Sequence, residues 1–183
     1  MFGKLAIAAT TAMLTASAGF AANPMVGGAP MYADKTIVEN AVNSDDHETL
    51  VTAVKAAGLV ETLQGEGPFT VFAPTDAAFG KLPDETVKAL LTPPYKDKLT
   101  EILTCHVVPA DAMAADIRGM IDDDGGMHVV PTLGGCELEA RHDGANLMLT
   151  DERGQTIKVT IADVEQSNGV IHVIDTVILP GME

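Results

Sequence analysis

The residues best suited to covalent chemistry are an adjacent cysteine and histidine, Cys105 and His106. A thiol becomes a strong nucleophile when a nearby histidine accepts its proton, which is the chemistry of many hydrolases. The β-branched residues Val107 and Val108 follow directly and predict a strand that begins at Cys105. Neighbouring side chains of a strand point to opposite faces, so this pair cannot act as a dyad. Two roles remain open for His106: a structural role, held by backbone hydrogen bonds, and a role in binding a partner.

The chain lacks other common signatures of catalysis. It contains no Gly-x-Ser-x-Gly motif, phosphate-binding loop, dinucleotide fingerprint or two-histidine zinc motif. We therefore predict that the protein is not an enzyme and has no cofactor. A hydrolase of unknown type is kept as an alternative class.

Two groups of residues invite comparison with metal sites. Residues 122–124 are consecutive aspartates before two glycines, but they lack the alternating ligands and final glutamate of a calcium loop, so we predict a solvated turn. Methionines are numerous and, together with His128, raise the idea of periplasmic copper. They are Met25, Met31, Met113, Met120, Met127 and Met148. Their spacing is irregular and methionine often fills gaps in cores, so we predict no metal site. Copper or small-ligand binding is the alternative function.

The amino-terminal residues predict export. Lys4 precedes an apolar run over residues 5–18, and small residues occupy the end of this segment, so residues 1–21 read as a secretory signal peptide. We expect a secreted, periplasmic or cell-surface protein with no membrane insertion after the signal is removed. Cysteines in these compartments usually pair, so Cys105 and Cys136 are expected to form a disulfide, with two buried thiols as the alternative.

The charge of the chain limits its partners. The sequence has 26 Asp and Glu against 11 Lys and Arg, a net charge of −15 at pH 7. Such a surface repels phosphate backbones and anionic lipid head groups, which excludes nucleic acid as a partner. After the signal peptide we predict an extended leader over residues 22–34 and a single, monomeric domain over residues 35–183.

The domain is organised around residues 70–79. The sequence from Thr70 to Phe72 predicts a buried strand that ends at Pro74, because proline has no N–H to donate to a neighbouring strand. Thr75 or Asp76 is placed to cap a following helix. Phe79 lies one turn into that helix, so we expect Phe72 and Phe79 to share one core.

The two halves of the domain differ in periodicity. Apolar residues recur at helical spacing in several short segments between residues 36 and 104, whereas apolar and polar residues alternate after Met127. Within residues 168–180, apolar residues occupy both faces from Val170 to Ile174, around His172, as in a strand that is covered on both sides. We expect His172 to be a hydrogen-bonded core residue. This pattern predicts the α+β class.

Residues 70–79 and 168–180 resemble the two signature segments of the fasciclin domain, an extracellular module of cell-adhesion and matrix proteins. Residues 105–109 are similar to the central Tyr-His segment of this family, with Cys105 in place of the tyrosine. The resemblance covers most of the chain after Asp34. It implies a fasciclin-like fold, an antiparallel β wedge packed with several short helices.

The resemblance also implies a function. A fasciclin domain would be a binding module that mediates adhesion to a surface protein, a matrix or a polysaccharide. Asp163 and Val164 align with the Asp-Ile pair that some animal fasciclin domains present to integrins, and His106 lies in the segment linked with adhesion. These three residues are the candidate binding residues. The alternative for Asp163 is that it caps a turn at the end of a strand.

Overall fold

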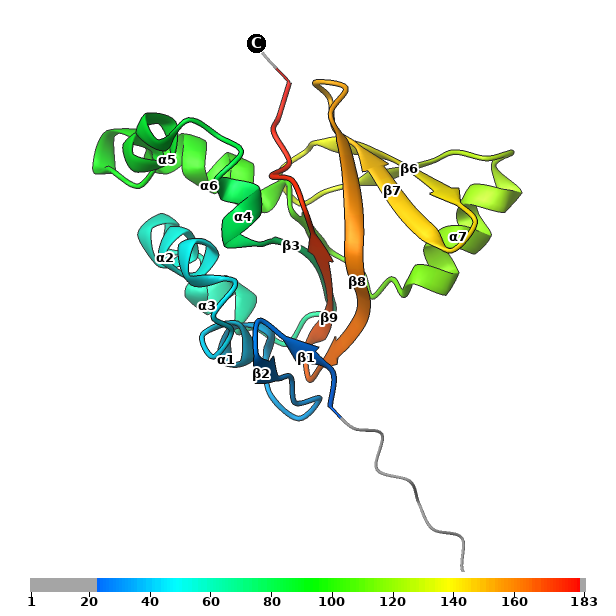
Figure 1. Ribbon diagram of the computed structural model, residues 1–183, viewed down its shortest axis with the longest axis horizontal. Coiled ribbons are helices and arrows are strands. Elements are labelled where there is room, and N and C mark those ends of the chain that lie inside the picture. Colours follow the sequence, from blue (N-terminus) through cyan, green and yellow to red (C-terminus); the bar gives the residue numbers. More distant parts are fainter. Residues whose placement is uncertain (1–22, 182–183) are drawn as a thin grey trace, which may run out of the picture.

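The computed structural model describes residues 23–181, so the predicted signal peptide lies outside the described residues. The main feature is a seven-stranded sheet with the order β4-β3-β9-β8-β7-β6-β5 (Figure 1). The strands are β3 (Phe69–Pro74), β4 (Val107–Val108), β5 (His128–Pro131), β6 (Glu137–Asp143), β7 (Asn146–Thr150), β8 (Thr156–Gln166) and β9 (Gly169–Ile174). Within this sheet β3 and β9 run parallel and the other neighbours run antiparallel. The α+β class is therefore confirmed, with one parallel pair in the otherwise antiparallel wedge.

Helices cover the two sides of this sheet unequally. In Figure 1 the helices from α1 to α6 gather on one side of β3 and β9, and α7 lies on the other side, near β6 and β7. The helices are α1 (Ile37–Ala41), α2 (Glu48–Ala57), α3 (Val60–Leu63), α4 (Asp76–Phe79), α5 (Asp84–Leu90), the 3₁₀ turn η1 (Pro93–Tyr95), α6 (Lys96–Thr104) and α7 (Ala114–Asp123). Helices this short are marginal in isolation, so packing must hold them in place.

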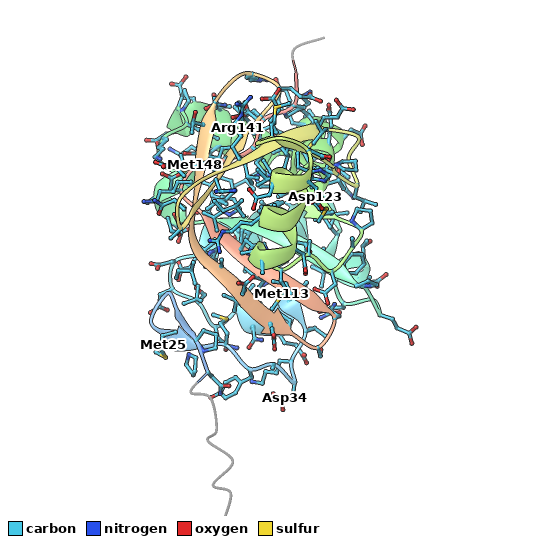
Figure 2. All side chains as sticks on the ribbon, turned by 90° about the vertical axis from the view of Figure 1, so that its right-hand side faces the viewer. Met25, Asp34, Met113, Asp123, Arg141 and Met148 are labelled. Carbon is cyan, nitrogen blue, oxygen red and sulfur yellow. A yellow bond between two sulfur atoms is a disulfide. The ribbon has the colours of Figure 1, made fainter. Side chains whose placement is uncertain are left out.

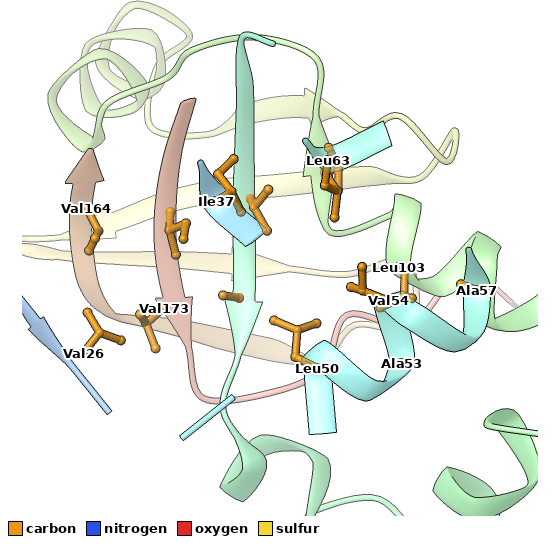
Figure 3. Packing of buried hydrophobic residues seen from close by; sticks show 14 of the residues in the cluster. Val26, Ile37, Leu50, Ala53, Val54, Ala57, Leu63, Leu103, Val164 and Val173 are labelled. Atoms are coloured by element: carbon orange, nitrogen blue, oxygen red, sulfur yellow. The ribbon is translucent and has the colours of Figure 1, made fainter. Parts of the chain in front are cut away.

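The hydrophobic interior consists of two main cores. The helical core, shown in part in Figure 3, comprises Val26, Met31, Ile37, Leu50, Ala53, Val54, Ala57, Leu63, Val71, Ala73, Leu99, Leu103, Val107, Val164, Ile171 and Val173. The sheet core comprises Phe72, Cys105, Val108, Ala114, Ile117, Ile121, Val130, Cys136, Leu138, Ala140, Leu147, Leu149, Ile157, Val159, Ile174 and Ile178. A smaller group, Ala78, Ile102 and Val177, packs with residues of α4 and α5.

Strand β3 divides its side chains between these cores. Val71 and Ala73 enter the helical core, and Phe72 enters the sheet core, because successive side chains of a strand alternate between its faces. Phe79 is half-buried and packs against the helical core and the smaller group instead. The expectation that Phe72 and Phe79 share a core is therefore wrong. Of the two expected capping residues, Thr75 is the N-cap, since its Oγ1 accepts a hydrogen bond of 3.2 Å from the Ala78 N–H.

The segment expected to be an extended leader is a folded hairpin. Strands β1 (Met25–Val26) and β2 (Ala29–Pro30) pair antiparallel, and Gly27 and Gly28 form the turn between them with positive φ angles. Val26 and Met31 are buried in the helical core. These apolar contacts make the hairpin part of the folded unit rather than a separate leader.

Helix α7 has no counterpart in the sequence analysis. Ala114, Ile117 and Ile121 are buried and lie three and four residues apart, which is helical spacing. The three aspartates expected in a solvated turn occupy the last turn of α7 and its C-cap, Asp124. Many aspartates and Gly119 make this a weak helix by propensity, so burial of its apolar stripe in the sheet core decides its conformation.

The turn before β9 connects distant elements. The Asn168 side chain accepts a hydrogen bond from the Ile37 N–H at 3.0 Å and donates to the Leu63 carbonyl at 2.8 Å. A Cβ on Gly169 would lie 1.9 Å from the Phe69 carbonyl oxygen, so only glycine allows β9 to begin this close to β3. This turn thereby fixes α1 and α3 against the parallel strand pair.

Candidate functional site

Asp163 lies at an irregularity in β8. The pairing of β8 with β9 shifts between Ile161 and Val164, and Asp163 has a φ of 58°, a left-handed conformation that aspartate tolerates better than most residues. Its side chain is exposed, and its Oδ1 accepts a hydrogen bond of 2.6 Å from the Ala114 N–H. A carboxylate at this position compensates the free N–H groups of a helix. Asp163 therefore caps the helix α7 from strand β8. It does not cap a turn at the end of its own strand, which was the alternative.

His172 lies directly beneath this irregularity and is fully buried. Its Nδ1 accepts a hydrogen bond of 3.2 Å from the Asp163 N–H, and its Nε2 donates one of 2.9 Å to the Ala112 carbonyl. This arrangement needs a neutral ring that carries its proton on Nε2. Burial lowers the pKa of His172, against the opposing effects of the Ala112 carbonyl and the nearby Asp163 and Asp111.

Thr70 completes the same network. Its hydroxyl donates to the Ala110 carbonyl at 2.7 Å and accepts from the Ala112 N–H at 2.9 Å. We name Thr70, Ala112, Ala114, Asp163 and His172 the α7 junction, because together they attach the start of α7 to strands β3, β8 and β9. The sequence analysis missed Thr70, although a hydroxyl inside an otherwise apolar strand is a signal that a buried partner must exist.

His106 lies in a separate network, in the turn between α6 and β4 rather than on a strand. Its Nδ1 donates to the Ile102 carbonyl at 2.7 Å, and its Nε2 accepts from the Ile178 N–H at 3.0 Å. Burial lowers the pKa of His106 to about 4, although the Ile102 carbonyl and Asp151 act in the opposite direction. These contacts are those of the structural role, since both ring nitrogens are occupied and the side chain is 2% exposed.

Cys105 is bonded to Cys136, with their Cα atoms 5.3 Å apart, so the expected disulfide is confirmed. The sulfur next to His106 is therefore not a thiol, and this pair offers no nucleophile.

The structure separates the three candidate binding residues. Asp163 is exposed, whereas Val164 is fully buried in the helical core and His106 is nearly so. A direct contact between a partner and Val164 or His106 would require β8 or α6 to open. Of the three, Asp163 is the residue that can reach a partner in the folded protein.

The methionines labelled in Figure 2 do not gather into one site. Met25, Met113 and Met148 lie well apart on the hairpin, at the start of α7 and on β7 (Figure 2). Met127 accepts a hydrogen bond from Arg141, and His128 Nδ1 lies 2.6 Å from an oxygen of Asp124. Over residues 23–181, no group of three or more His, Cys, Asp or Glu side chains is arranged to hold a metal ion.

In the same part of the chain, no helix has the length and apolar character needed to cross a membrane.

Comparison with known proteins gives one consistent family. The model of the Fasciclin domain family matches residues 45–180. Protein sll1483 of Synechocystis sp. is 49% identical over 149 residues, which span 80% of this chain and 74% of that protein. The cell surface glycolipoprotein MPB83 of Mycobacterium bovis is 32% identical over 159 residues, covering 84% of this chain and 64% of that protein.

A solved structure shows the same fold. It is a FAS1 domain pair from the insect cell adhesion molecule fasciclin I, which superposes with a TM-score of 0.70 at 20% sequence identity. The match covers 81% of this chain and 51% of that two-domain chain. The wedge of strands with several short helices is thus a known arrangement.

Proposed function

Because this chain belongs to the fasciclin domain family, we propose that it is an exported binding module that mediates adhesion without catalysing a reaction. Its partner would be a surface protein, a matrix component or a polysaccharide. The proposal draws on two relatives by their names alone: one is a cell adhesion molecule and another a cell surface glycolipoprotein. The predicted signal peptide supports a periplasmic, cell-surface or secreted location.

The observation that carries the proposal is the exposed side of the α7 junction. Asp163 adopts a strained backbone conformation at the irregularity in β8, and such strain is often found where a protein presents a residue for function. Its Oδ1 is bound to α7, but none of the described residues donates a hydrogen bond to its Oδ2. One carboxylate oxygen therefore orients the side chain while the other is free for a partner.

One exposed neighbour extends this surface along β8. Glu165 is exposed and pairs with Val170, which lies on the same face of β9 as His172, so an acidic side chain accompanies Asp163. We define Asp163 and Glu165 as the β8 contact surface. A partner with a basic group would be complementary to it.

The state of Cys105 and the buried histidines supports binding rather than turnover. Both nitrogens of His106 and His172 are occupied by backbone groups, and Cys105 is in a disulfide. A general base needs a free nitrogen within reach of a substrate. Ser44 Oγ lies 2.8 Å from His47 Nδ1, but both residues are buried, so a substrate does not reach this pair in the folded protein.

The test is the substitution Asp163→Asn in cells that produce the protein. Asparagine keeps the oxygen that caps α7 and tolerates a positive φ, so the fold is preserved while the charge is removed. We expect attachment of the cells to their partner surface to fall by about fivefold or more. The matched control is Asp97→Asn, which removes an exposed carboxylate from α6 and should leave attachment unchanged.

Two outcomes would contradict the proposal at different levels. Unchanged attachment by a folded, exported Asp163→Asn protein would overturn the β8 contact surface. Normal attachment by cells that lack the whole protein would overturn the adhesive function.

A further inference from the structure

A surface groove lies over the helical half of the protein, remote in sequence from the β8 contact surface. It opens between α2, α5, η1 and α6 and has a volume of about 220 Å³. Its walls include Ala56, Leu90, Leu91 and Leu99, with Lys96 as its charged residue. The groove is therefore mostly aliphatic, with one cation.

The groove continues toward the interior through shared walls. Leu90, Leu91 and Leu99 also line a cavity of about 20 Å³ beneath it. This cavity shares Leu103 and His106 with a third, of about 40 Å³, in the helical core. Cavities lined by aliphatic groups stay dry and can accept apolar molecules. The three spaces mark a path of weak packing from the surface into the helical core.

Helix α5 covers these spaces but is held by few buried contacts. None of its residues is buried, and Val87 and Leu90 are only half-buried above the cavity. Two prolines, Pro93 and Pro94, end the segment at η1. A helix with so little buried area can shift outward at low cost, because local stability follows the number of buried apolar contacts.

The groove contains one charged side chain, Lys96. Lys96 forms no ion pair within residues 23–181, where the lysine ion pairs involve Lys81 and Lys98. Its Nζ lies near Gly58, at the carboxyl end of α2. In a chain of net charge −15, an unpaired lysine beside an aliphatic groove provides a local site for an anion.

We propose that this groove binds a linear aliphatic carboxylate, with the tail along Leu90, Leu91 and Leu99 and the carboxylate on Lys96. Aliphatic walls favour methylene groups because contact removes apolar surface from water. Lys96 determines the sign of the head group. This binding is independent of the adhesive function, since it uses a different part of the protein.

The test is calorimetric titration of the purified protein with decanoate and with decyltrimethylammonium, both below their micelle concentrations. The two probes share a tail and differ in the sign of the head group. The overall charge of the protein attracts the cation, so a preference for decanoate reports on Lys96. We expect saturable 1:1 binding of decanoate, tightening by about fourfold per added methylene.

Matched variants locate the site. Ala56→Phe places a ring in the groove from an exposed position of α2 and should weaken decanoate binding by about tenfold or more, whereas Ala115→Phe on the exposed side of α7 should not change it. Lys96→Ala should remove the preference for the anion, and Lys98→Ala should retain it. Absence of saturable decanoate binding, equal effects of the two phenylalanines or a preference for the cation would each overturn the proposal.

Discussion

The helical core and the sheet core bury similar aliphatic side chains but are held together differently. The strands around the sheet core form consecutive antiparallel hairpins from β5 to β8, and the disulfide between Cys105 and Cys136 joins its two sides. The helical core is enclosed by helices of four to ten residues. It also contains apolar cavities of about 40 and 30 Å³.

This difference shows where the protein is rigid and where it can adapt. A disulfide between residues 31 apart stabilises a fold by about 3.5 kcal/mol in the chain-entropy model, and both cysteines lie in the sheet core. Short helices around unfilled space lose less when they move, because fewer contacts are broken. We infer that the sheet core sets the stability of the domain and that the helical core provides room for a ligand.

The largest expected effect separates two phenylalanines that serve different cores. Phe72 is fully buried in the sheet core and stacks on His172 with ring centroids 5.6 Å apart. Phe72→Ala should lower the free energy of unfolding by about 3–5 kcal/mol. Phe79→Ala, at a half-buried site beside a cavity, should cost about half as much. Urea denaturation measures both, and equal losses would contradict the distinction between the cores.

Local signals in the sequence predicted much of this architecture. The cap at the start of α4 and the alternating strands after Met127 both depend on residues close in the chain. Their physical causes are side-chain capping and the two-residue repeat of a strand, each visible in a short window. The fasciclin resemblance then supplied the overall arrangement.

The features that were missed depend on distant contacts. Phe72 and Phe79 enter different cores because they lie on opposite sides of the sheet. The residues between them in the sequence do not reveal this separation. Asp163 caps α7 across 49 residues, so its role could not be assigned before the helix was known. The fasciclin resemblance indicated Val164 as a binding residue. The register shift in β8 instead directs its side chain into the helical core. Of the three candidate binding residues, Asp163 is exposed, and its role in binding stays a prediction.

A smaller effect concerns pH and the histidine beside the helical cavities. His106 has a folded pKa of about 4, below its ordinary value of about 6.5, so the folded state binds fewer protons than the unfolded state. Stability therefore falls as pH drops below about 6.5 and stops falling from this cause near pH 4. Between pH 7 and 5 His106 alone should account for a loss of about 2 kcal/mol.

The measurement is urea denaturation of the wild type and His106→Gln at several pH values from 7 to 5. Glutamine does not titrate, so the variant should show a shallower decline whatever its absolute stability. His172 and His47, whose pKa values burial also lowers, should retain the rest of the slope. The carboxylates with lowered pKa values, Glu39 and Asp175, lose their contribution only below about pH 4.5, outside this window. If the stability of both proteins declined equally with pH, the fold would not lower the pKa of His106, and the prediction would be wrong.

The smallest expected effect tests the comparison most directly, because one substitution should have opposite signs in the two cores. Val71 lines two cavities of the helical core, of about 40 and 30 Å³, so Val71→Ile adds a methylene where space exists. It should stabilise the protein by about 0.5–1 kcal/mol. Val130 is buried in the sheet core and lines neither cavity, so Val130→Ile should destabilise by about 1 kcal/mol through overpacking. Both replacements keep a β-branched side chain on a strand, which leaves local propensity almost unchanged. Urea midpoints that move in the same direction would show that the two cores are equally well packed. The core beneath the groove would then be packed too densely for the groove to deepen toward the interior.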